Sequence, residues 1–504
     1  MDNTKYSYAE RLGRWLAGAF AAYRGPFISG LAVGLAAHMF MFANKLVNHD
    51  DIEALFFKGA TVTSGRWGLE LSRLLFPNIS MPWIYGLVTL LLITASACLI
   101  LNVLDIRSGL MRLLLPAAVV SFPSLTGTFC FMFTSSAYGL AFLLSVLCVY
   151  MYKKGGAANA VLAVFSLLLC LSIYQAYIAI SASLFILLMM KRCLRPGETW
   201  RGIVLFGLKA LGMMLVSLLL YFAVTLLVFR LTGAEFNSYV IDNVNSGAGI
   251  PGKIRMAYES FRDIFTIRNY SLISSEASGY IHMALAAFIC LGLLLASAGR
   301  GLMERLLLAA LLLLLPLSIN CMYLMMSPQS IHTLVLYSFV CFYFLAGITL
   351  EALGGVWLRA AKDLLALALG IVIASNVYFA NMTYLKLHLQ YESASSFYIS
   401  MIAQIKDTEG FDENSRLAII GSQDNLLYYA PELDTHMLQG PSYDLINIYS
   451  RESLFRQYLG FDLPFATAEE AERISAMPEF EQMAEYPYNG SVKKIENYIV
   501  VKLG

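Results

Sequence analysis

Long, uninterrupted apolar stretches recur from residue 27 to residue 385, and they constrain the fold of this chain more than any other feature. The first stretch, residues 27–46, is close to the length of about 20 residues that a helix needs to cross a hydrocarbon core. Charged residues make up only 14% of the sequence, whereas soluble domains carry about 25%. The sequence therefore predicts an all-α polytopic membrane protein.

Apolar length and flanking charge together predict about eleven transmembrane helices. Basic residues precede the first stretch and mark every second connection after it. Under the positive-inside rule these connections and the N-terminus face the cytoplasm, and the C-terminal part lies outside. We expect spans at residues 27–46, 82–104, 111–125, 136–152, 157–173, 176–190, 204–229, 281–297, 306–325, 331–352 and 363–384.

The charge distribution divides the chain into two predicted domains. Residues 386–504 contain 18 acidic and 9 basic residues and carry −9, whereas residues 1–385 carry +10. We therefore predict a transmembrane catalytic domain over residues 1–385 and a small extracytoplasmic α/β domain over residues 386–504. In this second domain the pattern predicts helices up to about residue 406 and over 467–476, and strands over 416–421 and 498–503.

Two adjacent carboxylates, Asp50 and Asp51, follow the first apolar stretch directly. Charge at the edge of a bilayer is costly and calls for an explanation. Asp50 and Glu53 have the spacing of a capping box, so Asp50 would cap a helix that begins at Asp51. A helix N-terminus also stabilises an ionised carboxylate, which is the form that a general base requires. Capping and catalysis are therefore compatible, and the adjacent His49 favours catalysis.

Further candidates lie along the outer side of the predicted bundle. Arg66 could bind phosphate in a forked geometry, or it could contact lipid head groups at the interface. Trp67 could stack on a sugar, although tryptophan is common at bilayer edges for any function. Tyr174 and Gln175 lie between two short spans, where they could line a cavity or join helices by hydrogen bonds. His332 lies at the end of a span, where it could belong to the site or serve only a structural role.

No metal or cofactor is predicted for this chain. The outer segments contain no carboxylate cluster with ligand-like spacing beyond Asp50 and Asp51, so a divalent metal is not favoured. The sequence has no P-loop and no convincing nucleotide fingerprint. These observations argue against a reaction driven by ATP or by a nucleotide-activated sugar, and nothing indicates a nucleic-acid partner.

Asp50-Asp51, Gly65-Arg66-Trp67 and Tyr174-Gln175 resemble, in order and spacing, the glucosyltransferases of the second Gtr type that modify bacterial O-antigens. These polytopic enzymes belong to the GT-C class. The resemblance covers most of the membrane part, whereas residues 230–280 and 386–504 carry no matching motif. It implies a polyprenyl-phosphate-linked sugar donor, expected to carry glucose, an extracytoplasmic or lipid-linked glycan acceptor, and a bacterial inner membrane.

The resemblance also implies roles for the candidate residues in an inverting displacement. A first-loop aspartate would act as general base, with Asp51 slightly preferred over Asp50. Arg66 would bind the lipid phosphate, and His332 stands where such enzymes often place another phosphate contact. The alternative function is a transporter or flippase for a lipid-linked saccharide. It is less favoured because no internal repeat is evident and ionisable residues collect at the span ends. Lys209 is the exception, and it lies near enough to the predicted cytoplasmic edge to snorkel.

Overall fold

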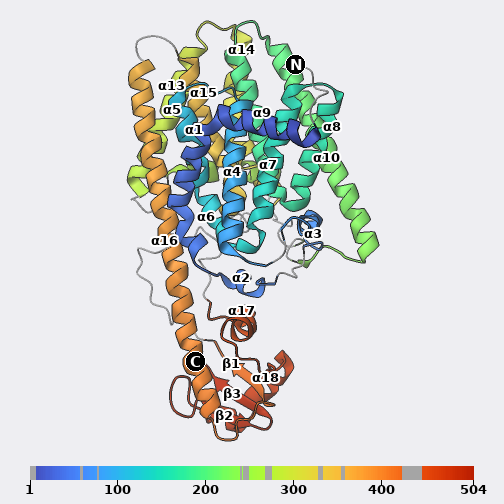
Figure 1. Cartoon of the computed structure of the whole chain (residues 1–504), viewed down its shortest axis with the longest axis vertical. Helices are drawn as coiled ribbons and strands as arrows, with labels where there is room; N and C mark the ends of the chain where they lie inside the picture. Colours follow the sequence, from blue (N-terminus) through green and yellow to red (C-terminus); the bar gives the residue numbers. More distant parts are fainter. Residues whose placement is uncertain are drawn as a thin grey trace.

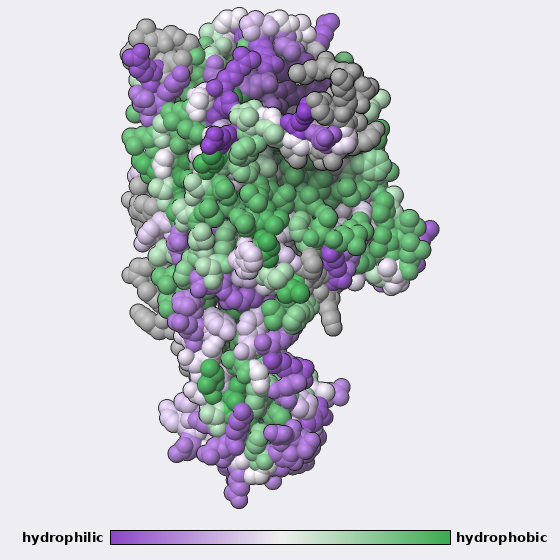
Figure 2. Space-filling model, viewed as in Figure 1, coloured by the Kyte–Doolittle hydropathy of each residue, from purple (hydrophilic) through white to green (hydrophobic). Residues whose placement is uncertain are grey.

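The computed structural model describes residues 7–56, 61–76, 79–238, 241, 249–266, 275–326, 333–353, 358–422 and 445–504. In this part of the chain, ten helices are long and apolar enough to cross a membrane. The 17-residue helix α8 (Ala157–Ile173) is a shorter eleventh. The predicted polytopic membrane protein with about eleven spans is confirmed. On the face seen in Figure 2, a broad hydrophobic band crosses the bundle, with hydrophilic residues gathered above and below it.

The bundle is built from helices of very different lengths. Besides α8, they are α1 (Tyr8–Ala43), α4 (Pro82–Val103), α5 (Gly109–Ser121), α6 (Pro123–Cys130), α7 (Met132–Lys154), α9 (Ile178–Leu194), α10 (Trp200–Thr232), α12 (Ile250–Thr266), α13 (Ser275–Ala296), α14 (Leu302–Ile319), α15 (Val340–Ala352) and α16 (Leu358–Asp407). Short 3-10 turns lie at Gln175–Tyr177, Cys321–Leu324 and Thr333–Phe339.

The span expected at residues 111–125 is made of two helices, α5 and α6. Phe122 joins them in an extended conformation, with ψ of 138°. The next residue is Pro123, which disfavours the helical conformation at the residue before it and lacks the N–H that a continuous helix would use. The span consequently runs from Gly109 to Cys130, five residues beyond the expected end.

Helix α1 begins well before the expected start of the first span and contains Pro26. Proline in a helix interior removes a hydrogen bond and bends the helix. In Figure 1 the first part of α1 crosses the view, and the second part runs along the bundle. His38 fixes this second part, because its Nε2 donates to the Val120 carbonyl at 2.8 Å and its Nδ1 accepts from the Tyr384 hydroxyl at 2.7 Å. These bonds join α1 to α5 and α16.

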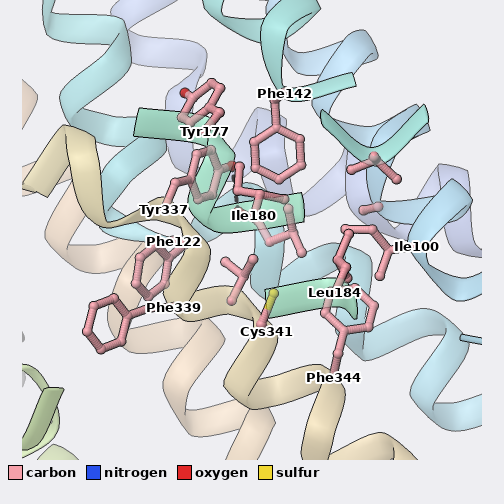
Figure 3. Packing of buried hydrophobic residues seen from close by; sticks show 14 of the residues in the cluster. Ile100, Phe122, Phe142, Tyr177, Ile180, Leu184, Tyr337, Phe339, Cys341 and Phe344 are labelled. Atoms are coloured by element: carbon pink, nitrogen blue, oxygen red, sulfur yellow. Dashed lines mark hydrogen bonds between the residues drawn. The ribbon is translucent and has the colours of Figure 1, made fainter. Parts of the chain in front are cut away.

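Helix α15 lies at the centre of the bundle. All residues from Val340 to Leu350 are buried, as expected for a helix that is hydrophobic on every side. Aromatic rings pack around the turn that precedes it (Figure 3), where the Tyr337 ring lies 4.7 Å from Phe142 and 6.0 Å from Phe122. The same buried cluster includes Trp67 and Leu69 of the first loop.

The connections with positive charge meet at one end of the bundle. Asp105 contacts Lys153 at 2.9 Å and Arg195 at 2.7 Å, although these residues come from three separate connections. Arg300 donates to the Cys193 carbonyl at 2.8 Å and so belongs to the same end. This grouping is what the alternating charge pattern requires. The assignment of this end to the cytoplasm stays a prediction.

At the other end, helix α16 carries the chain out of the bundle towards the tail (Figure 1). It is a single helix of 50 residues, about 75 Å long at 1.5 Å per residue. A hydrocarbon core is about 30 Å thick, so a large part of α16 projects beyond it. The expected span at 363–384 and the expected tail helix are therefore one element, and the predicted domain boundary after residue 385 falls inside it.

The tail is a small α/β unit around a three-stranded sheet. Strands β1 (Arg416–Ile420), β3 (Tyr498–Lys502) and β2 (Val492–Ile495) lie in that order, with β1 parallel and β2 antiparallel to β3. The described tail also contains α17 (Ile448–Ser453), a π-helical turn (Leu454–Tyr458), α18 (Ala468–Ser475) and α19 (Pro478–Glu481). The predicted strands and the predicted helix near 467–476 are confirmed.

The core of the tail includes residues from the first loop. One buried cluster contains Val47 and Ile52 of the first loop together with three residues of the tail: Tyr398 of α16, Phe455 of the π-helical turn and Ile499 of β3. Burial of apolar surface is the main force that holds two elements together. The tail is consequently attached to the loop that carries the two adjacent carboxylates.

Candidate active site

The acidic loop, residues 44–56, contains the short helix α2 (His49–Glu53). Its N-cap is Asn48, whose Oδ1 accepts a hydrogen bond from the backbone N–H of Asp51 at 2.7 Å. The prediction that Asp50 caps a helix beginning at Asp51 is therefore wrong. Asparagine and aspartate are about equally good caps, so local preference does not distinguish the two positions. The earlier start places Asp51 in the first turn, where its side chain is fully buried.

Both carboxylate oxygens of Asp51 are bound by neighbouring side chains. Oδ1 accepts a hydrogen bond of 2.6 Å from Ser80, and Oδ2 forms an ion pair with Lys45. The Lys45 ammonium also donates to the Ser80 hydroxyl at 2.7 Å. The three side chains form a closed triangle that ties the loop after α1 to the start of α4. A buried carboxylate with these partners stabilises the loop geometry.

Asp50 has a different environment, because its side chain is about one-third exposed. The nearest ring nitrogen, His49 Nε2, lies 3.5 Å from Asp50 Oδ1. Burial lowers the pKa of His49 below its usual 6.5, although the charge of Asp50 acts in the opposite direction. His49 is therefore mostly neutral at neutral pH and pairs only weakly with Asp50 at this distance. The Asp50 carboxylate also accepts a hydrogen bond from the Tyr449 hydroxyl, and its side chain stays about one-third exposed.

The tail covers the acidic loop through α17, which packs against α2 (Figure 1). The rings of Tyr449 and His49 lie 5.9 Å apart. Burial and the adjacent charge of Asp50 raise the pKa of Tyr449 to about 12, so its hydroxyl stays protonated over the physiological range. The tail thus places a neutral phenol beside the accessible carboxylate.

Arg66 lies among aromatic rings just before helix α3 (Trp67–Ser72). Its Nη1 donates to the Tyr138 hydroxyl at 3.2 Å, and its guanidinium lies 5.2 Å from the centre of the Tyr174 ring. Those two rings stack on each other with 4.3 Å between their centres. A guanidinium on an aromatic face is held in place, and its planar N–H groups match the geometry of an oxyanion. We call Arg66, Tyr138 and Tyr174 the arginine group.

The turn before Arg66 is held by hydrogen bonds from two helices. Gln175 donates to the Ser64 carbonyl at 3.2 Å and to the Tyr221 hydroxyl at 2.9 Å. Tyr221 in turn donates to the Gly65 carbonyl at 3.0 Å. Gly65 has φ of +70°, and a Cβ there would lie 2.6 Å from the Tyr221 oxygen. Both strain and space therefore require glycine at this turn.

Two candidate residues remain, Trp67 and His332. Trp67 is buried, and its Nε1 donates to the Thr225 hydroxyl at 3.1 Å, so it joins α3 to α10. In this arrangement the indole ring packs inside the protein. His332 lies outside the described residues.

The predicted site residues fall into two groups at the end of the bundle that faces the tail (Figure 1). One set lies at or next to the arginine group and contains Arg66, Trp67, Tyr174 and Gln175. The other lies in the acidic loop and contains His49, Asp50 and Asp51. Sequence reasoning missed their partners Lys45, Ser80, Tyr138, Tyr221, Thr225 and Tyr449. Lys45 had a usable signal, since a lysine at the predicted outer end of a span departs from the positive-inside rule.

The described part of the chain has no group of three His, Cys, Asp or Glu side chains that could hold a metal ion. The acidic loop offers a carboxylate, and the arginine group offers a guanidinium. A carboxylate can accept a proton, and a guanidinium can stabilise a departing anion.

Comparison with known proteins identifies the family. The family model described as Glucosyl transferase GtrII matches residues 39–343, more than half of the chain. The matched stretch contains the acidic loop and the arginine group, whereas residues 344–504 lie outside it. No curated protein and no solved structure matches the chain. The family favours an enzyme over the transporter or flippase alternative. The chain belongs to the GtrII glucosyl transferase family and is a membrane glycosyltransferase.

Proposed function

We propose that this enzyme transfers a sugar from a polyprenyl-phosphate donor to an extracytoplasmic or lipid-linked glycan, with inversion at the anomeric carbon. The family description supports glucose as the sugar. The resemblance of the motifs to O-antigen-modifying enzymes of the GT-C class supports the lipid-linked donor. The position of both residue groups at one end of a membrane bundle is consistent with a donor whose phosphate lies at the bilayer surface.

The observation that carries the proposal is the contrast between the two adjacent carboxylates. Asp51 is fully buried, and both of its oxygens are bound by Lys45 and Ser80. Asp50 is partly exposed, and its neighbour His49 is mostly neutral. A general base must reach the acceptor hydroxyl within about 3 Å and must not be neutralised by a permanent ion pair. We therefore assign the base to Asp50 and the positioning of α2 to Asp51.

Arg66 is proposed to bind the donor phosphate. When the bond between the anomeric carbon and the phosphate oxygen breaks, the leaving phosphate gains one negative charge. A guanidinium held against Tyr138 and Tyr174 can stabilise that charge without first being ordered. Arginine also matches the phosphate oxygens with two parallel N–H groups.

The proposed reaction is a single displacement. The acceptor hydroxyl loses its proton to Asp50 while its oxygen forms a bond with the anomeric carbon. The bond from that carbon to the phosphate oxygen breaks on the opposite face, so the configuration inverts. The lipid phosphate leaves as the anion bound by Arg66, and the proton on Asp50 returns to solvent.

The proposal is tested with purified protein, polyprenyl-phosphate-glucose and candidate glycans. We expect a glycosylated product whose new linkage has the opposite anomeric configuration to the donor, measured by NMR. A product with retained configuration would contradict the single displacement. Passage of the donor across a vesicle membrane without any glycosylated product would contradict the transferase itself. A heat-inactivated sample and the Arg66→Ala variant serve as controls.

A further inference from the structure

A second basic site lies at the end of the bundle away from the tail. A cavity of about 560 Å³ lies there among α7, α8, α9 and α10, within the usual range of roughly 300–1,000 Å³ for small-ligand sites. Its wall carries five basic and two acidic side chains. They are Lys153, Lys191, Arg192, Arg195 and Lys209, and Asp105 and Glu198.

Ion pairs fix most of this wall. Asp105 accepts from Lys153 at 2.9 Å and from Arg195 at 2.7 Å, so a single carboxylate serves two cations. Glu198 binds Arg192 through two parallel hydrogen bonds of 3.1 and 2.9 Å. The paired side chains hold the cavity in shape and leave an excess of positive charge around it.

Lys209 differs from the other cations of the cavity. Among the residues that the structure describes, it has no acidic partner within ion-pair distance. Lys191 lies 3.8 Å from Glu351, just behind the wall. Even when Glu351 is counted, the basic side chains exceed the acidic ones by two. The cavity therefore favours an anionic ligand, and Lys209 is the cation that such a ligand would neutralise.

The cavity opens beside exposed apolar side chains, which suit the acyl chains of a lipid. Lys209 lies nine residues after Trp200, the first residue of α10, and so about 13 Å deeper along the helix axis. Next to it, Leu205 and Leu208 are exposed on α10, and Val161 and Phe165 are exposed on α8. An unpaired ammonium beside apolar, lipid-facing surface is costly unless an anion neutralises it. A ligand with an anionic head group and apolar chains would satisfy both the charge and the exposed apolar surface.

We infer that this cavity binds the phosphate head group of an anionic membrane phospholipid, with Lys209 pairing with the phosphate and the acyl chains lying against α8 and α10. Basic recesses between transmembrane helices recognise anionic head groups in this way. The site lies at the opposite end of the bundle from the acidic loop. Its lipid binding is therefore separate from the proposed transfer reaction and does not depend on it.

The test is a lipid titration of the purified full-length protein in detergent, followed by native mass spectrometry. Phosphatidylglycerol is compared with phosphatidylcholine of the same acyl chains and with inorganic phosphate. We expect phosphatidylglycerol to bind in preference to both. One lysine near a membrane surface is equivalent to about a fivefold change in affinity. Lys209→Met should therefore weaken binding about fivefold and Lys209→Glu roughly 25-fold.

Lys154 supplies the matched control. It lies at the same end of the bundle, is outside the cavity wall, and places its ammonium 4.6 Å from the Tyr150 ring. Lys154→Met should leave the affinity within about twofold of wild type, and Lys209→Arg, which keeps the charge, should bind as wild type does. Equal losses in Lys154→Met and Lys209→Met, or a loss in Lys209→Arg as large as in Lys209→Met, would overturn the inference. So would equal affinity for phosphatidylcholine, and inorganic phosphate bound as tightly as the lipid would indicate a site for soluble anions instead.

Discussion

Removal of the charge at Asp51 should destabilise the protein through Lys45. Asp51→Asn keeps the side-chain size, and the backbone N–H of residue 51 can still donate to Asn48. The Lys45 ammonium, however, loses its counterion. Breaking a buried ion pair by removing one partner costs about 3–5 kcal/mol. Lys45 keeps 28% of its side chain exposed and can regain some water, so we expect a smaller loss of about 2–3 kcal/mol.

A double-mutant cycle isolates this ion pair from other effects of the substitution. Lys45→Met in the Asp51→Asn background removes the unpaired charge, so the double variant should be more stable than the sum of the single losses predicts, by at least about 1 kcal/mol. Thermal unfolding of each variant in lipid nanodiscs, followed by intrinsic fluorescence, measures the effect. Asp50→Asn is the matched control, because Asp50 is partly exposed and has no ion pair with a lysine or arginine among the described residues, so its loss should cost less stability than the loss of Asp51.

Two results would refute this reasoning. Wild-type stability of Asp51→Asn would mean that the triangle of Lys45, Asp51 and Ser80 does not hold the loop. Strictly additive losses in the double variant would mean that Lys45 and Asp51 stabilise the protein independently. Either result would also remove the ground for treating Asp51 as a positioning residue.

Four further predictions follow from the same structure. Arg66→Lys and Arg66→Ala should weaken donor binding in that order, by roughly 10- to 150-fold for alanine, since a charge-assisted hydrogen bond contributes about 1.5–3 kcal/mol; unchanged binding by Arg66→Ala in an equilibrium titration would transfer the phosphate role to another residue. Gly65→Ala should lower the melting temperature more than Gly233→Ala, because both glycines have positive φ but only Gly65 would place a Cβ against Tyr221; equal losses would exclude that clash. The pKa of His49 in the folded protein lies below its usual 6.5, so at a pH between these two pKa values the unfolded protein binds more protons than the folded protein. The stability that neutral His49 contributes is therefore complete above about pH 6.5 and declines as the pH falls. His49→Gln should reduce the loss of melting temperature between about pH 7.5 and 5.5, and a pH profile equal to that of wild type would contradict this role of His49. A cysteine at the exposed position Asp462 should react with a membrane-impermeant reagent on intact cells, whereas labelling only after lysis would reverse the predicted topology.

The spans and the tail elements could be predicted because each depends on its own residues. Apolar length and positive connections determine where helices such as α4 and α7 lie, and the alternating charge places Lys153 and Arg195 at one end with Asp105. The strands at 416–420 and 498–502 follow from short apolar runs bounded by polar residues. The break before Pro123 was visible in the sequence as well, although the hydropathy pattern alone passes over it.

The division of labour between Asp50 and Asp51 could not be predicted, because it depends on tertiary contacts. Asn48 and Asp50 are similar capping residues, and the choice of Asn48 places both carboxylates in the first turn of α2. Only the folded chain brings Ser80 and Lys45 to Asp51. The approach of Tyr449 is equally non-local, since it comes from a tail without a recognisable motif. Sequence spacing thus located the loop, while packing assigned its residues.

The most direct test of the proposed mechanism is single-turnover transfer by Asp50→Asn, with donor binding and thermal stability measured on the same preparation. The substitution removes the proton acceptor but retains the size of the side chain. We predict transfer at least about 100-fold slower than wild type, with unchanged affinity for polyprenyl-phosphate-glucose and a smaller loss of melting temperature than in Asp51→Asn. Wild-type transfer by Asp50→Asn would contradict the assignment. So would a loss of transfer in Asp51→Asn without any loss of stability.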